Sequence, residues 1–417
     1  MPQVFLGNFD FEHELAAKSN SPTNALRRLN AELSWHLAAL TTPGDGIWLP
    51  AMPSSEFLTA ARELLGDVLL SKDASAFRGG FTICPWGWSS QIRTLAERHH
   101  LTANGPSLTA TRRANSRQHS FLIEQQLEVA LAGTFAIAGM DQLEHALITR
   151  FNSSPDQRWV IKSDFGMSGR ERVVGHGPQL DEAARRWIEK RLARHEWLIF
   201  EPWLDRISEA GILLDIPKRE DSGNAIRLVA LTELMTDSRG QYAGTRTGPD
   251  VNAKAETIWQ PAVEAAMQFA ILLRAEGYFG PIGIDAMQYF ATEADRIAGR
   301  PSIRPIQDVN ARWTMGFIAA TWTQRLAPNA CSTWRLMPVK DFCQRLNLGG
   351  NLEGERQLLR TRGLDLTEAL LGPTASARVL WTSPICLGNE PVRHVGLLIS
   401  GATRDIVDDA ERRVISG

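Results

Sequence analysis

A single lysine at the end of an apolar strand is the first residue whose type and position could do chemistry. Lys162 lies in the segment 159–163, and lysine is scarce here: only seven of the 45 lysine and arginine residues are lysine. The loop that follows contains Gly166, Ser168, Gly169 and Arg170. Glycines let the backbone approach a ligand closely, and successive N–H groups there form a concavity that suits phosphate oxygens. The segment indicates phosphate binding, although a plain β-hairpin with a surface lysine fits the same letters.

Acidic residues interrupt two apolar strands further along the chain. Asp285 lies within 280–290, while Asp308 and Asn310 are two residues apart and therefore share one face of the second strand. Oxygen ligands of this kind suit Mg²⁺, and isolated carboxylates inside strands are costly unless they are paired or metal-bound. We therefore predict a metal site at Asp285, Asp308 and Asn310. Structural salt bridges to Arg304 or Arg312 are the alternative.

A third feature follows the apolar segment 197–200. Glu201 ends that segment, Trp203 comes two residues later, and Glu209 lies eight residues beyond Glu201. A carboxylate at the end of a buried strand can accept a hydrogen bond from an amino group or from ribose hydroxyls, and Trp203 could cover the face of a base. Each residue is unremarkable alone, and Trp203 fits an ordinary core position equally well.

Alternating strands and helices must position these residues. Residues 1–110 alternate short apolar strands with helical segments, which is typical of a small α/β unit with a largely parallel sheet. From about residue 111 we expect a helix beginning near Asn115 or Ser116, the strand hairpin around Lys162, and a long helix over 255–277. Residues 1–110 contain neither of the two common phosphate-binding glycine motifs, G-x-G-x-x-G and G-x-x-x-x-G-K-[ST], and no internal repeat is visible in the chain.

Composition excludes several classes of protein. The 417 residues carry a formal net charge of -2, so no excess of positive charge is available to bind a nucleic-acid backbone. No apolar run approaches the roughly 20 residues of a membrane span, and we expect no signal peptide. The four cysteines are far apart, without metal-ligand spacing. We expect a cytoplasmic protein with unpaired thiols.

Taken in chain order, these features resemble the ATP-grasp superfamily. The resemblance covers about half of the chain, from Asn115 to Arg312, and the alternating unit before it resembles the domain that commonly precedes this fold. It implies that Arg117, in place of the usual lysine, and Lys162 bind the phosphates of ATP. It also implies that the loop with Gly166, Ser168 and Gly169 closes over them.

The same resemblance assigns the remaining residues. Glu201 and Trp203 resemble the hinge that reads adenine, and Glu209 resembles the ribose-binding acid. Asp285 resembles the first Mg²⁺ ligand, while the stretch from Asp308 to Asn310 resembles the E-x-N motif with aspartate in place of glutamate. Arg312 extends that motif, so the resemblance implies that Arg312 and Lys162 act in catalysis.

Two departures from the family pattern bear on the site. The side chain of Asp308 is one methylene shorter than the usual glutamate, which affects how a metal ion would be held. Gly283 stands where some amino-acid ligases of the family carry an arginine. Arg246, Arg304 or Arg312 would have to replace that arginine.

The resemblance implies an α/β fold in which two β-sheet lobes clasp ATP after a small Rossmann-like domain. The four expected parts are 1–110, the preceding domain; 111–197, the N-lobe; 198–330, the C-lobe with the metal site; and 331–417, a C-terminal extension. The implied activity is ATP-dependent ligation of a small-molecule carboxylate to an amine, for example an amino acid or peptide, through an acyl phosphate.

The implied cofactors are ATP and Mg²⁺, with Mn²⁺ as a substitute. ADP and phosphate would be released. A homodimer is the commonest prior expectation. Two alternatives stay open: a phosphotransferase whose acceptor keeps the phosphate, and a non-catalytic nucleotide-binding protein. Asp308 in place of glutamate favours the second, whereas the presence of Asp285, Asn310, Lys162 and Arg312 together argues against it. No binding of nucleic acid or membrane is expected.

Overall fold

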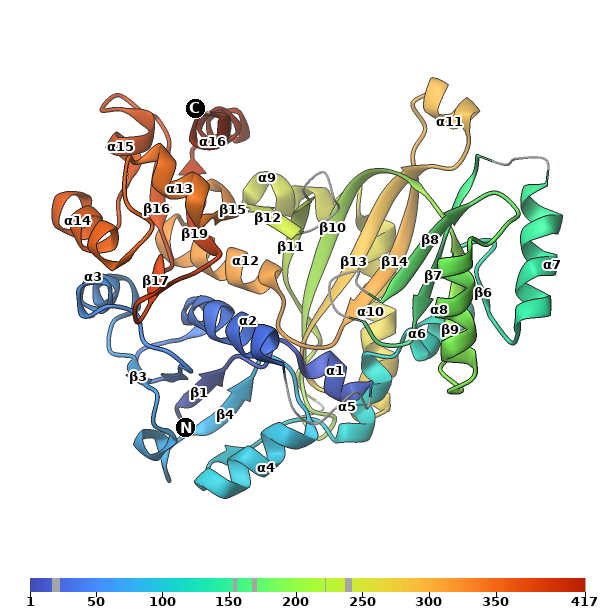
Figure 1. Ribbon diagram of the computed structural model, residues 1–417, viewed down its shortest axis with the longest axis horizontal. Coiled ribbons are helices and arrows are strands. Elements are labelled where there is room, and N and C mark those ends of the chain that lie inside the picture. Colours follow the sequence, from blue (N-terminus) through green and yellow to red (C-terminus); the bar gives the residue numbers. More distant parts are fainter. Residues whose placement is uncertain (17–22, 153–155, 167–170, 222, 237–241, 417) are drawn as a thin grey trace.

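Three β-sheets and a two-stranded ribbon organise the chain (Figure 1). The structure, a computed structural model, describes residues 1–16, 23–152, 156–166, 171–221, 223–236 and 242–416. Met167, Ser168, Gly169 and Arg170 lie outside the described residues, so the expectations for Ser168 and Gly169 stay predictions. No helix in the described part of the chain is long and apolar enough to cross a membrane.

The first sheet is parallel and has the strand order β3-β2-β1-β4-β5. Its strands are β1 (Gln3–Leu6), β2 (Gly46–Trp48), β3 (Leu69–Ser71), β4 (Thr82–Pro85) and β5 (Thr102–Ala103). The helices between them are α1 (Phe11–Leu15), α2 (Asn24–Ser34), η1 (Trp35–Leu40), α3 (Ser55–Leu65), η2 (Ala74–Phe77) and α4 (Ser90–His99). Since β1 leads to β2 on one side and β4 lies on the other, the strand order reverses between β1 and β4. In open parallel sheets a ligand crevice forms at the carboxyl ends of such strands.

The second sheet is antiparallel, with the order β6-β9-β7-β8. Its strands are β6 (Phe135–Ala136), β7 (Arg158–Ser163), β8 (Arg172–His176) and β9 (Leu198–Pro202). Helices α5 (Leu108–Ala114) and α6 (Arg117–Gln126) precede it, and α7 (Met140–Phe151) and α8 (Glu182–Leu192) accompany it. The rings of Trp159, Phe200 and Phe151 fill its core, together with Leu143 and Ile188 from the helices.

The third sheet has eight strands in the order β14-β13-β10-β11-β12-β15-β19-β16. They are β10 (Asp205–Ile216), β11 (Arg227–Thr236), β12 (Tyr242–Thr247), β13 (Gly280–Phe290), β14 (Ser302–Asn310), β15 (Cys331–Pro338), β16 (Arg378–Trp381) and β19 (His394–Gly401). Helix α10 (Gln260–Ala275) buries Phe269, Ala266 and Leu273 against β10, β13 and β14. In Figure 1 the edge strand β14, with its neighbour β13, lies beside the second sheet.

The remaining helices flank this large sheet. They are α9 (Pro249–Asn252), η3 (Ala253–Glu256), α11 (Glu293–Ile297), α12 (Met315–Leu326), α13 (Val339–Arg345), α14 (Leu352–Arg362), α15 (Thr367–Leu371) and α16 (Arg404–Ser416), and β17 (Cys386–Leu387) pairs with β18 (Glu390–Pro391). The expected helix over 255–277 begins only at Gln260, because Pro261 occupies its first turn, where proline is tolerated.

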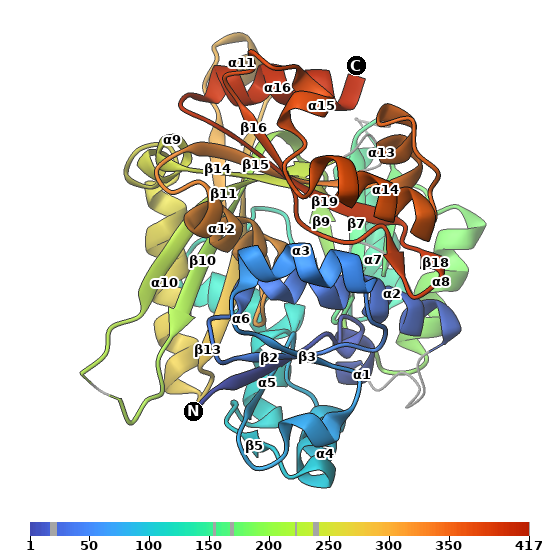
Figure 2. The same cartoon turned by 90° about the vertical axis from the view of Figure 1, so that its left-hand side faces the viewer.

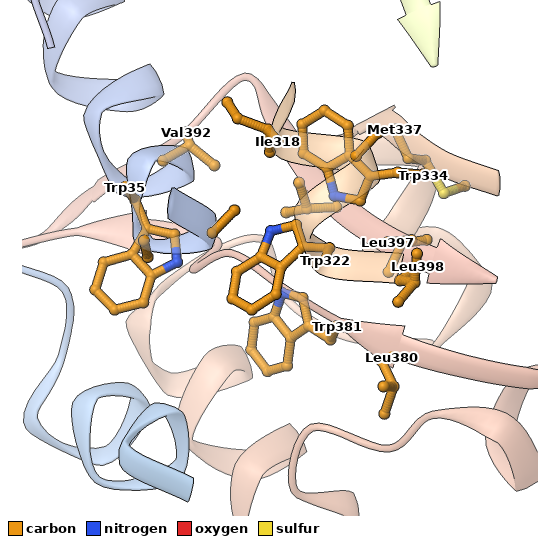
Figure 3. Close-up of a cluster of buried hydrophobic side chains, with 14 of the residues drawn as sticks. Trp35, Ile318, Trp322, Trp334, Met337, Leu380, Trp381, Val392, Leu397 and Leu398 are labelled. Carbon is orange, nitrogen blue, oxygen red and sulfur yellow. The ribbon is translucent and has the colours of Figure 1, made fainter. Parts of the chain in front are cut away.

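One hydrophobic core joins the N-terminal unit to the C-terminal segment. Figure 3 shows Trp35 across from Trp322 and Trp381, and Figure 2 shows α3 under the C-terminal helices. The indole N–H of Trp35 donates to the carbonyl of Thr382 at 3.0 Å, so this core is also hydrogen-bonded. The N-terminal unit is therefore fixed to the rest of the chain by burial.

The four-part division drawn from the sequence stays a prediction. Two of its boundaries, after residues 197 and 330, divide strands that belong to one sheet. Strand β9 begins at Leu198 and pairs with β7, so the second sheet continues past 197. The third sheet includes β15, β16 and β19, so the segment after 330 extends that sheet as well as packing against it.

Candidate active site

The start of helix α6 and the end of strand β7 are tied together by one carboxylate. Asp164 accepts a hydrogen bond from the Ser116 hydroxyl at 2.7 Å and another from the backbone N–H of Gln118 at 3.0 Å. The Ser116 hydroxyl oxygen also caps α6 by accepting from the N–H of His119 at 3.2 Å. Serine is a favoured N-cap because it satisfies a helical N–H that has no intrahelical partner. As expected, the helix begins directly after Ser116.

Arg117 bridges the second and third sheets. Its guanidinium donates to the Ser163 carbonyl at 3.0 Å, at the end of β7, and to the Asp308 carboxylate at 3.2 Å, on β14. A longer contact of 3.5 Å reaches the Gly166 carbonyl. A Cβ at Gly166 would lie 2.8 Å from the Cβ of Glu171, so this close approach requires glycine. Asp308 thus pairs with Arg117, and neither Arg304 nor Arg312 is its partner.

Lys162, Glu201 and Arg304 form a buried cluster of alternating charge. The Lys162 amine lies 2.8 Å from one Glu201 oxygen, and Arg304 donates to both Glu201 oxygens at 2.8 and 3.0 Å. The side chains are 12 %, 6 % and 4 % exposed for Lys162, Glu201 and Arg304. Burial alone would raise the pKa of Glu201, but the positive charges of Arg304 and Lys162 outweigh it and lower that pKa. Burial lowers the pKa of Lys162.

The two acids of the expected metal site face each other across neighbouring strands. Asp285 on β13 is directly opposite Asp308 on β14. Burial, with the nearby charges of Asp308 and Glu209, raises the pKa of Asp285 to about 8. Burial also acts to raise the pKa of Asp308, but Arg117 and Lys162 reverse that effect and lower it. Their environments therefore push the pKa values of two adjacent carboxyls in opposite directions.

The carboxylates of Asp285 and Asp308 fit a divalent cation whose coordination is completed by ligands from outside the chain. Among the described residues no group of three histidine, cysteine, aspartate or glutamate side chains could hold a metal. Mg²⁺, however, is commonly bound by one or two carboxylates together with substrate phosphates and water. Burial and the negative charges of Asp308 and Glu209 disfavour the ionised form of Asp285, and a cation bound there would favour it. The Asn310 amide nitrogen lies 3.4 Å from Asp285, whereas its oxygen is taken by Arg312.

Arg312 connects the acidic pair to the N-terminal unit. Its guanidinium donates to the Asn310 side-chain oxygen at 2.8 Å, to the Trp313 carbonyl at 3.0 Å and to the Glu12 carboxylate at 3.0 Å. It also lies 5.4 Å from the ring centroid of Trp86. Trp86 directly follows β4, which ends at Pro85. Arg312 therefore lies at the carboxyl end of the parallel sheet, next to the point where the strand order of that sheet reverses.

Glu209 and Trp203, the other two predicted nucleotide-binding residues, are in different surroundings. Glu209 pairs with Arg206 at 2.7 Å and helps to raise the pKa of Asp285, so it lies near the acidic pair. Trp203 is 37 % exposed and stacks on the Arg158 guanidinium, whose central carbon is 3.9 Å from the ring centroid. The roles predicted for Glu209 and Trp203 stay predictions.

A small cavity lies between α6, β9 and β14, beside the charged cluster. Its walls include Arg117, Glu124, Thr134, Glu201, Arg304, Gln307 and Asp308. Burial raises the pKa of Glu124 to about 8, so this carboxyl is largely protonated at neutral pH. The Thr134 hydroxyl and the Gln307 side-chain oxygen are buried without a hydrogen-bond partner among the described residues.

Sequence reasoning missed several residues that build this site. They are Glu12, Glu124 and Asp164, together with the structural roles of Asn115 and Arg304. Asn115 joins α5 to the end of β14, because its side chain accepts from the Ala311 N–H at 3.0 Å and donates to the Ala311 carbonyl at 3.3 Å. Asn115 lies within the predicted helix start, and Asp164 directly follows the strand predicted to contain Lys162, so proximity to these motifs is the signal that could have identified their roles.

The glycine at 283 has a steric explanation. A Cβ at this position would lie 2.7 Å from the Thr314 methyl carbon, so a side chain here would displace Thr314. Of the three arginines considered as replacements, Arg304 is committed to Glu201 and Arg246 to Asp408 at 3.1 Å. Arg312 is therefore the one of the three that lies beside the acidic pair.

Comparison with known proteins gives relatives by structure only. Neither a family model nor a curated protein matches the sequence. N5-carboxyaminoimidazole synthetase from Staphylococcus aureus, complexed with ADP, has a TM-score of 0.51 at 11% identity, over 93% of this chain and 94% of that one. The corresponding synthase from Aspergillus clavatus, with ADP and 5-aminoimidazole ribonucleotide, has a TM-score of 0.53 at 12% identity, over 92% and 99%.

Biotin carboxylase from Campylobacter jejuni, in a complex with a β,γ-ATP ligand, has a TM-score of 0.54 at 12% identity, over 97% of this chain and 88% of that one. These neighbours are ATP-grasp enzymes in which an N-terminal domain precedes the ATP-grasp part. The agreement extends over nearly the whole of each chain, and it matches the three sheets described above. The chain therefore has the ATP-grasp fold, with a preceding N-terminal α/β domain.

Proposed function

We propose that this protein is an ATP-dependent carboxylate–amine ligase. The observation that carries the proposal is the ion pair of 3.2 Å between Arg117 and Asp308, which brings the cations of one lobe onto the acids of the other. Lys162 belongs to the same cluster, because its charge acts on the pKa of Asp308. A triphosphate needs both cations and metal-binding acids within one site.

The residues of the chain divide the work of phosphoryl transfer. Lys162 and Arg117 would offset the negative charge of the phosphates, and both are held in place before the nucleotide arrives. Mg²⁺ held by Asp285 and Asp308 would neutralise charge on the transferred phosphoryl group. Asp285 must release its proton to hold that cation, so the cation competes with a proton whose binding the raised pKa of Asp285 favours.

Arg312 would orient the carboxylate that attacks the γ-phosphate. It lies between the acidic pair and the carboxyl ends of β1 and β4, where a substrate crevice is expected. The resulting acyl phosphate would then be displaced by an amine, and ADP and phosphate would be released. No side-chain nucleophile is needed for this sequence.

For the amine substrate, the comparisons support only a broad chemical class, that of small molecules. The Aspergillus clavatus neighbour was solved with an aminoimidazole ribonucleotide, which is a small-molecule amine. Nothing in these neighbours favours the peptide or amino-acid substrate expected from the sequence, so the proposal is limited to small-molecule substrates. The four free cysteines support the predicted cytoplasmic location.

The test is a screen of paired carboxylates and small amines for ATP-dependent phosphate release, with mass spectrometry of the products. A ligase releases ADP and phosphate only when both partners are present, and an amide appears among the products. A phosphorylated acceptor would instead identify a phosphotransferase, and nucleotide binding without turnover of any pair would contradict catalysis.

Replacing Lys162 then tests the site itself. We expect Lys162→Ala to lower turnover at least about a hundredfold, which is the scale of losing one electrostatic stabiliser of the transition state. Lys190→Ala, on the exposed side of α8, is the matched control and should keep normal turnover. Near-normal turnover in Lys162→Ala would remove Lys162 from the proposed site.

A further inference from the structure

Glu12 makes the ion pair to Arg312 from a different domain. It lies on the short helix α1 of the N-terminal unit, and its side chain is 10 % exposed. One of its oxygens, Oε1, lies 3.0 Å from both Nε and Nη2 of Arg312. The other, Oε2, is buried and has no hydrogen-bond partner among the described residues.

The contacts of Arg312 with its surroundings form a chain toward the metal-binding acids. Arg312 donates from Nη2 to the Asn310 oxygen at 2.8 Å, and the Asn310 nitrogen lies 3.4 Å from Asp285. The Trp86 ring also packs near the guanidinium, and the Trp313 N–H donates to the Trp86 carbonyl at 3.2 Å. The position of the Arg312 guanidinium therefore depends on the N-terminal unit.

A purely structural pair would not be built in this way. An unpartnered buried carboxylate oxygen is unfavourable, and a buried ion pair by itself is weak evidence for stability. Docking of the two units is already provided by their shared hydrophobic core and by the hydrogen bond from Trp35 to Thr382. The Glu12–Arg312 pair is therefore better explained by what it does to Arg312 than by what it adds to stability.

We infer that Glu12 is a positioning residue for Arg312, through which the N-terminal unit controls the reacting end of the site. This inference rests on the proposed function for its catalytic readout. Glu12 fixes the rotation of the guanidinium, and Arg312 in turn fixes the amide of Asn310 beside Asp285. Replacing a group that orients a metal ligand typically costs about 10- to 100-fold in activity, and we expect an effect of that size for the group that orients Arg312.

The experiment compares Glu12→Gln with Glu14→Gln in the full-length protein. Glu14 lies on the same helix but accepts from the Gln91 N–H and does not contact Arg312. We expect Glu12→Gln to lower kcat about 10- to 100-fold while the KM for ATP stays within about twofold, whereas Glu14→Gln keeps both constants. Glu12→Asp, which keeps the charge, should recover part of the kcat even if Glu12→Gln folds poorly.

A second readout does not depend on turnover. Arginine labelled with ¹⁵N gives an Nε–H signal for Arg312, which the Arg312→Lys variant assigns by its disappearance. We expect Glu12→Gln to shift and broaden that signal, and Glu14→Gln to leave it in place. The double variant Glu12→Gln/Arg312→Lys should have the kcat of Arg312→Lys alone, since both changes act through one group.

The outcomes separate the two claims. If the wild-type protein ligates no substrate pair but the Arg312 signal shifts in Glu12→Gln, the proposed function fails while the positioning contact stands. If Glu12→Gln keeps both the wild-type kcat and the wild-type Arg312 signal, the inference is overturned. It is also overturned if Glu12→Gln only lowers the melting temperature and leaves the kcat of the folded protein unchanged.

Discussion

Removing Arg304 should strongly destabilise the fold. In Arg304→Met, Glu201 would keep only Lys162, at 2.8 Å from one oxygen, and would lose both bonds of 2.8 and 3.0 Å from the guanidinium. The Ile306 carbonyl would also lose its bond of 3.1 Å from Arg304 Nε. Breaking a buried ion pair by removing one partner costs about 3–5 kcal/mol. Because Lys162 still neutralises Glu201 in part, we expect a loss of about 3 kcal/mol, at the lower end of that range.

Urea titrations followed by tryptophan fluorescence measure this loss as a change in the free energy of unfolding. The matched control is Arg300→Met, because Arg300 is exposed and its ion pair to Asp295 is long, at 3.6 Å. That control should stay within about 0.5 kcal/mol of wild type. A loss below about 1 kcal/mol in Arg304→Met would refute this reasoning.

Two further predictions concern buried carboxyls whose pKa is raised to about 8, Glu124 and Asp285. Between the ordinary carboxyl pKa and about 8, folded Glu124 keeps a proton that the unfolded chain has released. The free energy of unfolding therefore falls as pH rises through that window, by at most about 1.4 kcal/mol per pH unit. Glu124→Gln should remove this fall, so its melting temperature should exceed that of wild type at pH 8; equal pH dependence in both proteins would contradict the assignment. For Asp285, Mg²⁺ must displace the proton, so stabilisation of wild type by MgCl₂ should be larger at pH 8.5 than at pH 6 and absent in Asp285→Asn. A melting temperature of Asp285→Asn that still rises with MgCl₂ would place the cation elsewhere.

The sequence alone determined the elements of the site and the order in which they follow one another. Alternation of strands and helices before residue 110 predicted the parallel sheet, because strand and helix periodicities are local properties of the chain. Ser116 marked the start of α6 in the same way, since an N-cap acts within one turn. Lys162 stood out as a charge in an apolar strand, and Asp308 and Asn310 shared a face through the two-residue period of a strand.

Only the tertiary structure decided which charged groups meet. The partners Arg304 and Glu201 are 103 residues apart, and those of the Glu12–Arg312 pair are 300 residues apart. No local periodicity encodes such contacts, because they depend on how the three sheets are packed. From the sequence, Arg304 was only one alternative salt-bridge partner for the metal acids, and Glu12 was not considered. In the folded chain Arg304 pairs with Glu201, and Arg312 pairs with Glu12. The pKa values of Asp285 and Asp308 diverge for the same reason: burial and neighbouring charge are set by the folded environment, and the two identical side chains differ only in that.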